Sequence, residues 1–154
     1  MSRALGHYVS FHTLGGTAVT YGGGHLYASS ADLWQLIFEK TMLPVADLFL
    51  IVPHDSPGLR WEIETLKAHD ALSRCLFIMP PGSGEHYSAE MWQQTKEMMQ
   101  GYGLHLPRYN KEGMLFRLGA SGEMEEIWSF DAVWTGRLIE RIKHLFPERD
   151  DEIK

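Results

Sequence analysis

The stretch ADLFLIVPHDSPGLRWEIETLKAHDALSRCLFIMPP, residues 46–81, decides the fold. An apolar run at 48–52 stops at a proline, and a second apolar run at 75–79 stops at two prolines. Short apolar runs bounded by turn residues predict strands. A helical pattern at 57–72 lies between them. The order strand, loop, helix, strand is the unit of a parallel sheet, so the stretch predicts an α/β fold with strands at 47–52 and 75–79.

The polar loop HDSPG, residues 54–58, follows the first of these strands. Ligands of open α/β sheets bind beyond the carboxyl ends of the strands. His54, Asp55 and Ser56 are therefore the first candidate ligand-binding residues. The amide groups of the loop and the start of the next helix could also hold a phosphate group.

The remaining sequence predicts further short elements punctuated by glycine, proline and serine. They are strands within 8–21 around Gly15-Gly16, a helix from Ser29 or Ser30 that Pro44 stops, a helix over about 89–102 capped by Ser88, a hairpin over 113–130 turning at Ala120-Ser121-Gly122, and a last helix after Asp131. We predict one three-layer α/β domain over 1–154, with a mostly parallel central sheet and an added β-hairpin.

Composition narrows the class of protein. The 154 residues are 44% hydrophobic and 22% charged, which is ordinary for a globular domain. The net charge of −6, without a basic block, argues against binding to nucleic acid or to an anionic membrane surface. No apolar run is long enough to span a bilayer. The single cysteine, Cys75, lies in an apolar strand and is expected to be buried. We expect a cytoplasmic location.

The helix after HDSPG has distinguishable faces. At about 100° per residue, Leu59, Ile63 and Leu66 form one stripe that should face the sheet. Glu62 lies about 60° to the side of that stripe, where neighbours would remove part of its water. Glu64 points well away from the stripe and should lie on the solvent face.

Glu62 and Trp61 have a functional and a structural interpretation. A carboxylate beside a helix start can bind ribose hydroxyls and stabilise an oxocarbenium-like transition state. Trp61 would then cover a neighbouring loop or a bound ring. Alternatively, Glu62 favours the positive end of the helix dipole and Trp61 is a packing residue.

One family shares several of these sequence features. They are Leu33-Trp34, Ala46-Asp47, IVPHDSPG, Trp61-Glu62 and FIMPP. Over residues 30–81 the chain resembles the later half of TIR-like domains, and is most similar to versions in bacterial membrane-associated proteins of undefined function. The resemblance implies that Ser56, Trp61 and Glu62 occupy the family motif, in which the glutamate is catalytic in members that cleave NAD. Nucleoside deoxyribosyltransferases are similar in placing a glutamate on a helix after a glycine-containing loop.

The chain departs from the TIR pattern in two places. Trp61 and Glu62 are adjacent, whereas TIR domains usually separate the two residues by a few positions. The family also begins with a strand and a helix, and here glycine-rich, strand-like sequence stands before Ser30. The first strand–helix unit is therefore expected to be missing, replaced by a hairpin, or supplied by another part of a longer protein.

Other chemistry has weaker support in the sequence. The eight histidines form no HxH or HExxH pattern, so no metal site is predicted. His54-Asp55 is either an acid–base pair or a polar turn. Ser83, in the loop PPGSGEH after the second strand, is expected to touch any ligand bound at HDSPG.

Two classes of function follow. In the first, the domain binds a nucleotide-type ligand through His54, Asp55, Ser56, Trp61 and Ser83, and Glu62 assists cleavage of an N-glycosidic bond of NAD or a related nucleotide. NAD would then be a substrate or ligand, and no cofactor is expected. In the second, the domain is a non-catalytic interaction or sensor module, including an effector or immunity protein. It would bind another protein or self-associate through its five tryptophans and eight methionines.

Overall fold

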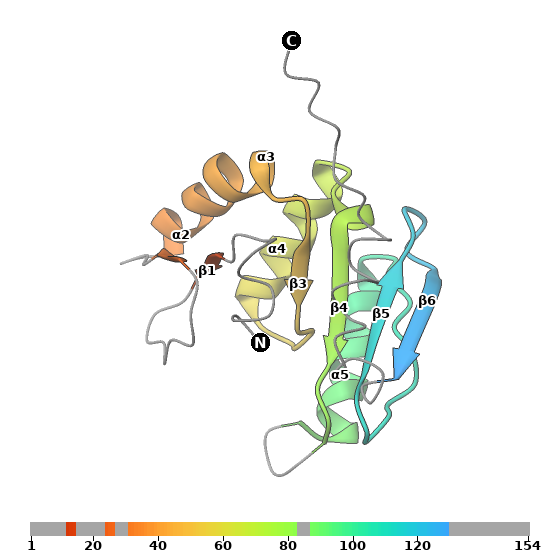
Figure 1. The fold of residues 1–154 in the computed structure, drawn as a ribbon. Helices are drawn as coiled ribbons and strands as arrows, with labels where there is room; N and C mark the ends of the chain where they lie inside the picture. The colour runs from red at the N-terminus through yellow and green to blue at the C-terminus, as the bar shows by residue number, and fades with distance from the viewer. Residues whose placement is uncertain (1–11, 15–23, 27–30, 83–86, 130–154) are drawn as a thin grey trace. The chain divides into compact units, whose positions relative to one another are not determined.

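The structure is a computed structural model that describes residues 12–14, 24–26, 31–82 and 87–129. The chain divides into two units, Met1–Ala46 with Ile139–Lys154, and Asp47–Leu138. We call the second of these the sheet unit, because it contains the predicted strand–helix–strand stretch (Figure 1). The predicted strand at 17–21, the caps Ser29 and Ser30 and the helix after Asp131 lie outside the described residues.

The first unit contains a short parallel strand pair and a helical segment. Strand β1 (His12–Leu14) lies within the predicted strand region and pairs in parallel with β2 (Gly24–Leu26). The helical segment comprises α2 (Ala31–Ile37), the π-helical turn η1 (Phe38–Met42) and α3 (Leu43–Val45).

The prediction that Pro44 stops this helix is wrong. Helical structure continues to Val45, because Pro44 lies at the start of α3, where a missing N–H is tolerated. The π-helical turn just before it changes the hydrogen-bond spacing from that of a regular α-helix.

The sheet unit is built on four strands in the order β3-β4-β5-β6. They are β3 (Phe49–Ile51), β4 (Cys75–Met79), β5 (Met114–Leu118) and β6 (Met124–Ser129). The predicted α/β class, the parallel pair β3–β4 and the hairpin β5–β6 are confirmed. The sheet is mixed, not mostly parallel, because the hairpin pairs directly with β4 in the antiparallel direction.

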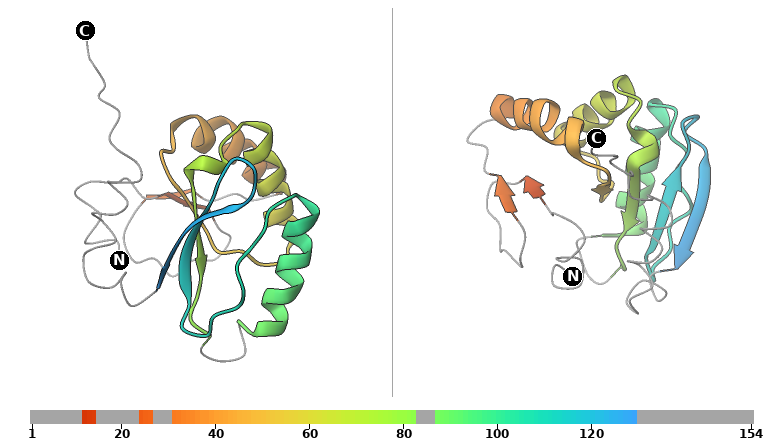
Figure 2. Two further views of the ribbon diagram at one scale, coloured as in Figure 1. Left: turned by 90° about the vertical axis from the view of Figure 1, so that its right-hand side faces the viewer. Right: turned by 45° about the horizontal axis from the view of Figure 1, so that its top comes forward.

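Two helices cover the same face of this sheet (Figure 2). They are α4 (Pro57–Ala68), which crosses from β3 to β4, and α5 (Ala89–Gly101), which follows β4. Ser56 and Ser88 cap them by accepting hydrogen bonds from backbone N–H groups three residues on, at 3.2 Å in each case.

An aromatic cluster joins α5 to the sheet. The rings of Phe77 and Phe116 stack at 5.4 Å on neighbouring strands, and Trp92 meets Phe116 edge-on at 6.1 Å. The indole Nε1 of Trp92 donates to the carbonyl of Pro107 at 2.9 Å. All three rings are at most 1% exposed, so the cluster is the centre of the core on this face.

The opposite face of the sheet is buried as well. Leu76 on β4 is 1% exposed and Leu115 on β5 is 3% exposed. Their positions alternate with those of Phe77 and Phe116, so their side chains point away from α5. Burial on both faces is the pattern expected of a central layer.

The turn between β5 and β6 requires a glycine. Gly122 has a φ of +82°, and any Cβ there would collide with the Gly103 carbonyl. Its N–H donates to the Gly119 carbonyl at 2.9 Å and closes the turn. The predicted turn at Ala120-Ser121-Gly122 is confirmed.

Replacing Phe116 with alanine should reduce the free energy of unfolding by about 3 to 5 kcal/mol, because it leaves a cavity between Phe77 and Trp92. Ile127, paired with Phe116 but 47% exposed, provides the control: its alanine variant should lose less than about 1 kcal/mol. Urea denaturation measures both. Equal losses would show that the aromatic cluster is not the core.

Candidate functional site

The loops after β3 and β4 lie against each other, as the sequence predicts. Both strands run in the same direction, so their carboxyl ends reach the same end of the sheet. The phenol of Tyr87, at the end of the second loop, donates a hydrogen bond to the carbonyl of Pro53 at 2.7 Å. This bond ties the two loops together one residue before His54.

A third segment joins them from the start of β5. The phenol of Tyr109 donates to the Tyr87 carbonyl at 3.3 Å, and the N–H of Gly82 donates to the Lys111 carbonyl at 2.8 Å. We call residues 52–56, 80–82, 87 and 107–113 the carboxyl-end loops. They form one hydrogen-bonded structure at the end of the sheet where a ligand of an α/β protein is expected.

Asp55 and Ser56 are engaged in local structure. Asp55 Oδ1 accepts from Arg60 Nε at 2.9 Å and from Nη2 at 2.7 Å. Ser56 Oγ accepts from the N–H of Leu59. Because Pro57 has no N–H and the Asp55 carboxylate is adjacent, this helix start is a poor site for a phosphate group.

His54 keeps one ring nitrogen for other contacts. Its Nδ1 lies 3.1 Å from the Val52 carbonyl oxygen, which can only accept, so Nδ1 carries the hydrogen. In the neutral imidazole, Nε2 is then the acceptor. The ring is exposed at the carboxyl end of β3, where it can reach a ligand.

The carboxyl group of Glu62 has an unusual pKa. It is half-buried on α4, and burial raises the pKa of its carboxyl from 4.5 to about 7. The charge on His54 acts in the opposite direction and lowers this pKa. Burial also raises the pKa of the Cys75 thiol to about 12, with a smaller lowering by Arg74 and a smaller raising by Glu62. Glu62 therefore lies within electrostatic reach of both His54 and Cys75.

A carboxyl group with a pKa of about 7 is half ionised at neutral pH. Such a group can act as an acid or a base, or can stabilise positive charge in its ionised form. The predicted position of Glu62 beside the apolar stripe is confirmed, since Leu59, Ile63 and Leu66 are buried.

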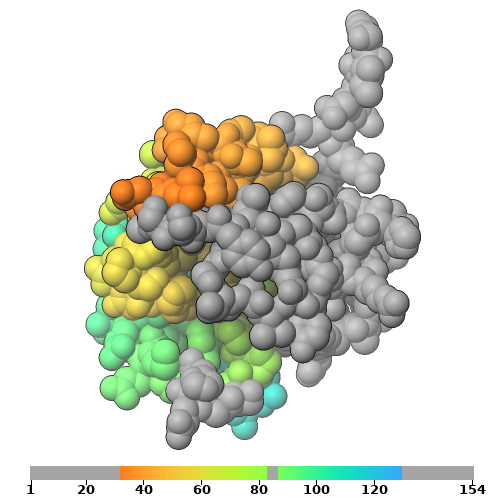
Figure 3. Space-filling view, turned by 90° about the vertical axis from the view of Figure 1, so that its left-hand side faces the viewer, coloured from red at the N-terminus to blue at the C-terminus, as the bar shows by residue number. Residues whose placement is uncertain are grey.

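The other predicted residues of this helix differ in their surroundings. Trp61 is half-buried, whereas Glu64 is exposed as predicted and hydrogen-bonds to the hydroxyl of Tyr102. Lys67 donates to the backbone carbonyl of Tyr102. These contacts link α4 to the end of α5, and the two segments (yellow and green) form adjoining surfaces in Figure 3. Ser83 lies outside the described residues.

Arg60 and Tyr87 also shape this region but were not predicted from the sequence, and Cys75, predicted only to be buried, is 0% exposed. Arg60 follows Asp55 by five positions, a spacing that could have suggested the ion pair. Tyr87 reaches the Pro53 carbonyl, and Cys75 comes within electrostatic reach of Glu62, only through the fold, so no local sequence pattern indicates either relationship.

In the part of the chain that the structure describes, no three His, Cys, Asp or Glu residues are grouped to hold a metal ion. None of the described helices has the length and apolar character needed to cross a membrane. No protein-family model, curated protein or solved structure matches the chain.

Replacing Glu62 with glutamine should stabilise the protein at pH 8. The folded pKa of about 7 lies above the unfolded value of 4.5, so folding favours the protonated carboxyl. That contribution is complete below pH 4.5 and is lost as pH rises through about 7. The variant should gain about 2 to 3 kcal/mol over the wild type at pH 8 and nothing at low pH.

Chemical denaturation across this pH range measures the difference. Glu112→Gln, at an exposed loop position, is the control and should follow the wild-type curve. Parallel curves for wild type and Glu62→Gln would show that the Glu62 carboxyl has an ordinary pKa.

Proposed function

We propose that the chain is a TIR-like domain that binds a nucleotide-type ligand at the carboxyl-end loops and, through Glu62, assists cleavage of an N-glycosidic bond in NAD or a related nucleotide. The observation that carries this proposal is the half-buried Glu62 carboxyl within electrostatic reach of His54. Structural carboxylates on a helix surface normally remain exposed or are paired.

The three-layer arrangement of TIR-like domains is part of the proposal. The crossover β3–α4–β4 and the burial of β4 and β5 on both faces support it. The mixed pairing of the sheet is a departure, since the hairpin stands beside β4. Similarity of fold does not establish an enzymatic activity, so the proposed activity depends on the chemistry of the site.

The proposed reaction uses the ionised form of Glu62. The bond between ribose C1′ and the base nitrogen breaks, and its electron pair leaves with the base. The positive charge that develops on the sugar is stabilised by the Glu62 carboxylate, which also orients the ribose hydroxyls. Water then adds to C1′ and releases a proton to the solvent.

The remaining candidate residues have supporting roles in this scheme. Trp61 would form a wall against the base or ribose, and Ser83 would approach from the loop after β4. Asp55 and Ser56 would act by holding the start of α4, through Arg60 and the Leu59 N–H respectively. Because this helix start is poor for anions, phosphate groups of the ligand would lie away from it.

A thermal-shift screen against NAD, ADP-ribose, nucleotides and deoxynucleosides tests binding. A ligand that binds the folded state should raise the Tm with its concentration. Product analysis of any hit then tests turnover, which should fall at least about 100-fold in Glu62→Gln, the scale of lost charge stabilisation. Glu64→Gln, two positions along the same helix, should retain turnover.

The pH profile separates this mechanism from a merely structural role. Activity should rise as pH increases through about 7, because the carboxylate is the active form. His54→Ala should move this rise to higher pH, since the charge on His54 lowers the Glu62 pKa. A shift in Tm with no turnover would reduce the proposal to binding, and no shift with any compound would overturn it.

A further inference from the structure

The edge of the sheet formed by β6 is open among the described residues. β6 is the last strand in the order β3-β4-β5-β6 and pairs with β5. In an antiparallel ladder, alternate backbone N–H and C=O groups of such a strand point outward. Six residues, Met124–Ser129, provide a strand of normal length for a partner to pair with.

Apolar side chains are exposed along this edge. Met124 is 42% exposed and Ile127 is 47% exposed, opposite the buried Leu118 and Phe116 respectively. The face of the sheet that forms the core therefore extends onto β6, where its apolar side chains are more exposed than those on β5. An added strand could place apolar side chains beside Ile127 and extend that face.

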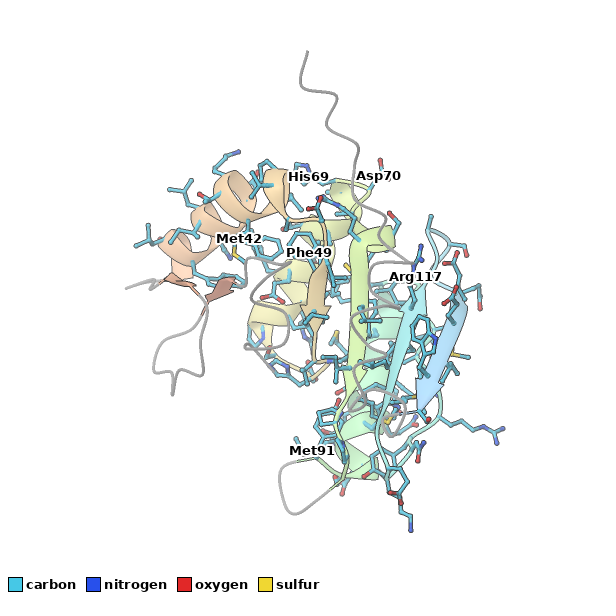
Figure 4. The ribbon with its side chains drawn as sticks, in the orientation of Figure 1. Met42, Phe49, His69, Asp70, Met91 and Arg117 are labelled. Atoms are coloured by element: carbon cyan, nitrogen blue, oxygen red, sulfur yellow. The ribbon has the colours of Figure 1, made fainter. Side chains whose placement is uncertain are left out.

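The edge is acidic. Glu123, Glu125 and Glu126 lie at its start, all exposed. Glu125 is 3.7 Å from Arg117, which Figure 4 labels on β5 beside the start of β6, and Glu123 is 3.6 Å from His105. The edge therefore has three carboxylates but only these two neighbouring basic side chains, in a chain whose net charge is −6.

This charge pattern determines which partner fits. A second copy of the chain also has a net charge of −6, and its β6 offers no basic side chain to pair with these carboxylates. Natural edges are commonly protected by lysine or proline, and β6 contains neither. The carboxylates therefore favour a basic strand over a second copy of the chain.

We propose that β6 is a docking edge for an extended basic segment of another protein, which adds to the sheet as a fifth strand. Its backbone would pair with the outer side of β6, its basic residues would face Glu123 and Glu126, and its apolar residues would pack beside Ile127. This edge uses none of the residues assigned to ligand binding, so the inference is independent of the proposed enzymatic activity.

The test uses the full chain and three synthetic heptapeptides. The first alternates lysine and valine, the second alternates glutamate and valine, and the third is the lysine–valine peptide with N-methylated backbone amides. Calorimetry should detect binding of the first peptide alone. Amide signals of β6 should shift in NMR spectra on binding, because strand addition uses the backbone.

Charge variants identify the surface. The double variant Glu123→Gln with Glu126→Gln should weaken binding of the lysine–valine peptide by at least about tenfold. Glu90→Gln with Glu112→Gln removes the same charge at two other exposed positions and should have little effect. Ile127→Ala should also weaken binding, because it removes the apolar contact.

Several outcomes would overturn the inference. Equal binding of the N-methylated peptide would show attraction by charge without strand addition. Absence of binding by the lysine–valine peptide, or equal losses in the two double variants, would remove the edge as its site. A dimer in sedimentation that Ile127→Ala dissolves would make β6 an interface between copies of this chain.

Discussion

The parallel pairing of β3 with β4 is the constraint on which the rest of the sheet unit depends. Parallel neighbours need a crossover, and α4 supplies it by burying Leu59, Ile63 and Leu66 against the sheet. The same pairing brings the loops after both strands to one end, where the Tyr87–Pro53 hydrogen bond joins them. The position of Glu62 on the crossover helix then follows from the helical period.

Glu62 is the residue at which stability and the proposed function oppose each other. Its partial burial disfavours the ionised carboxyl, so the folded protein is less stable at high pH than it would be with an amide there. A cost of this kind at one helix position is a common sign of a functional group.

Much of this architecture could be predicted because the signals are local. Strand 75–79 has proline at its end, α4 begins at Ser56-Pro57, and the hairpin turns at a glycine that must have positive φ. The placement of the hairpin beside β4 could not be predicted, because it depends on tertiary pairing. The π-helical turn before Pro44 has no marker in the sequence. The same distinction applies to the candidate site. The helical periodicity predicts that Glu62 lies beside the apolar stripe of α4. Its proximity to His54 and Cys75 arises only when the strands pair.

The most direct test of the account is an NMR titration of the Glu62 side-chain carboxyl, assigned with the Glu62→Gln variant. We predict a midpoint near pH 7 in the wild type, set mainly by burial, and a higher midpoint in His54→Ala. A midpoint near 4.5 that His54→Ala leaves unchanged would contradict both the burial of the carboxyl and its coupling to the strand end. Glu62 would then be an ordinary residue of a helix surface.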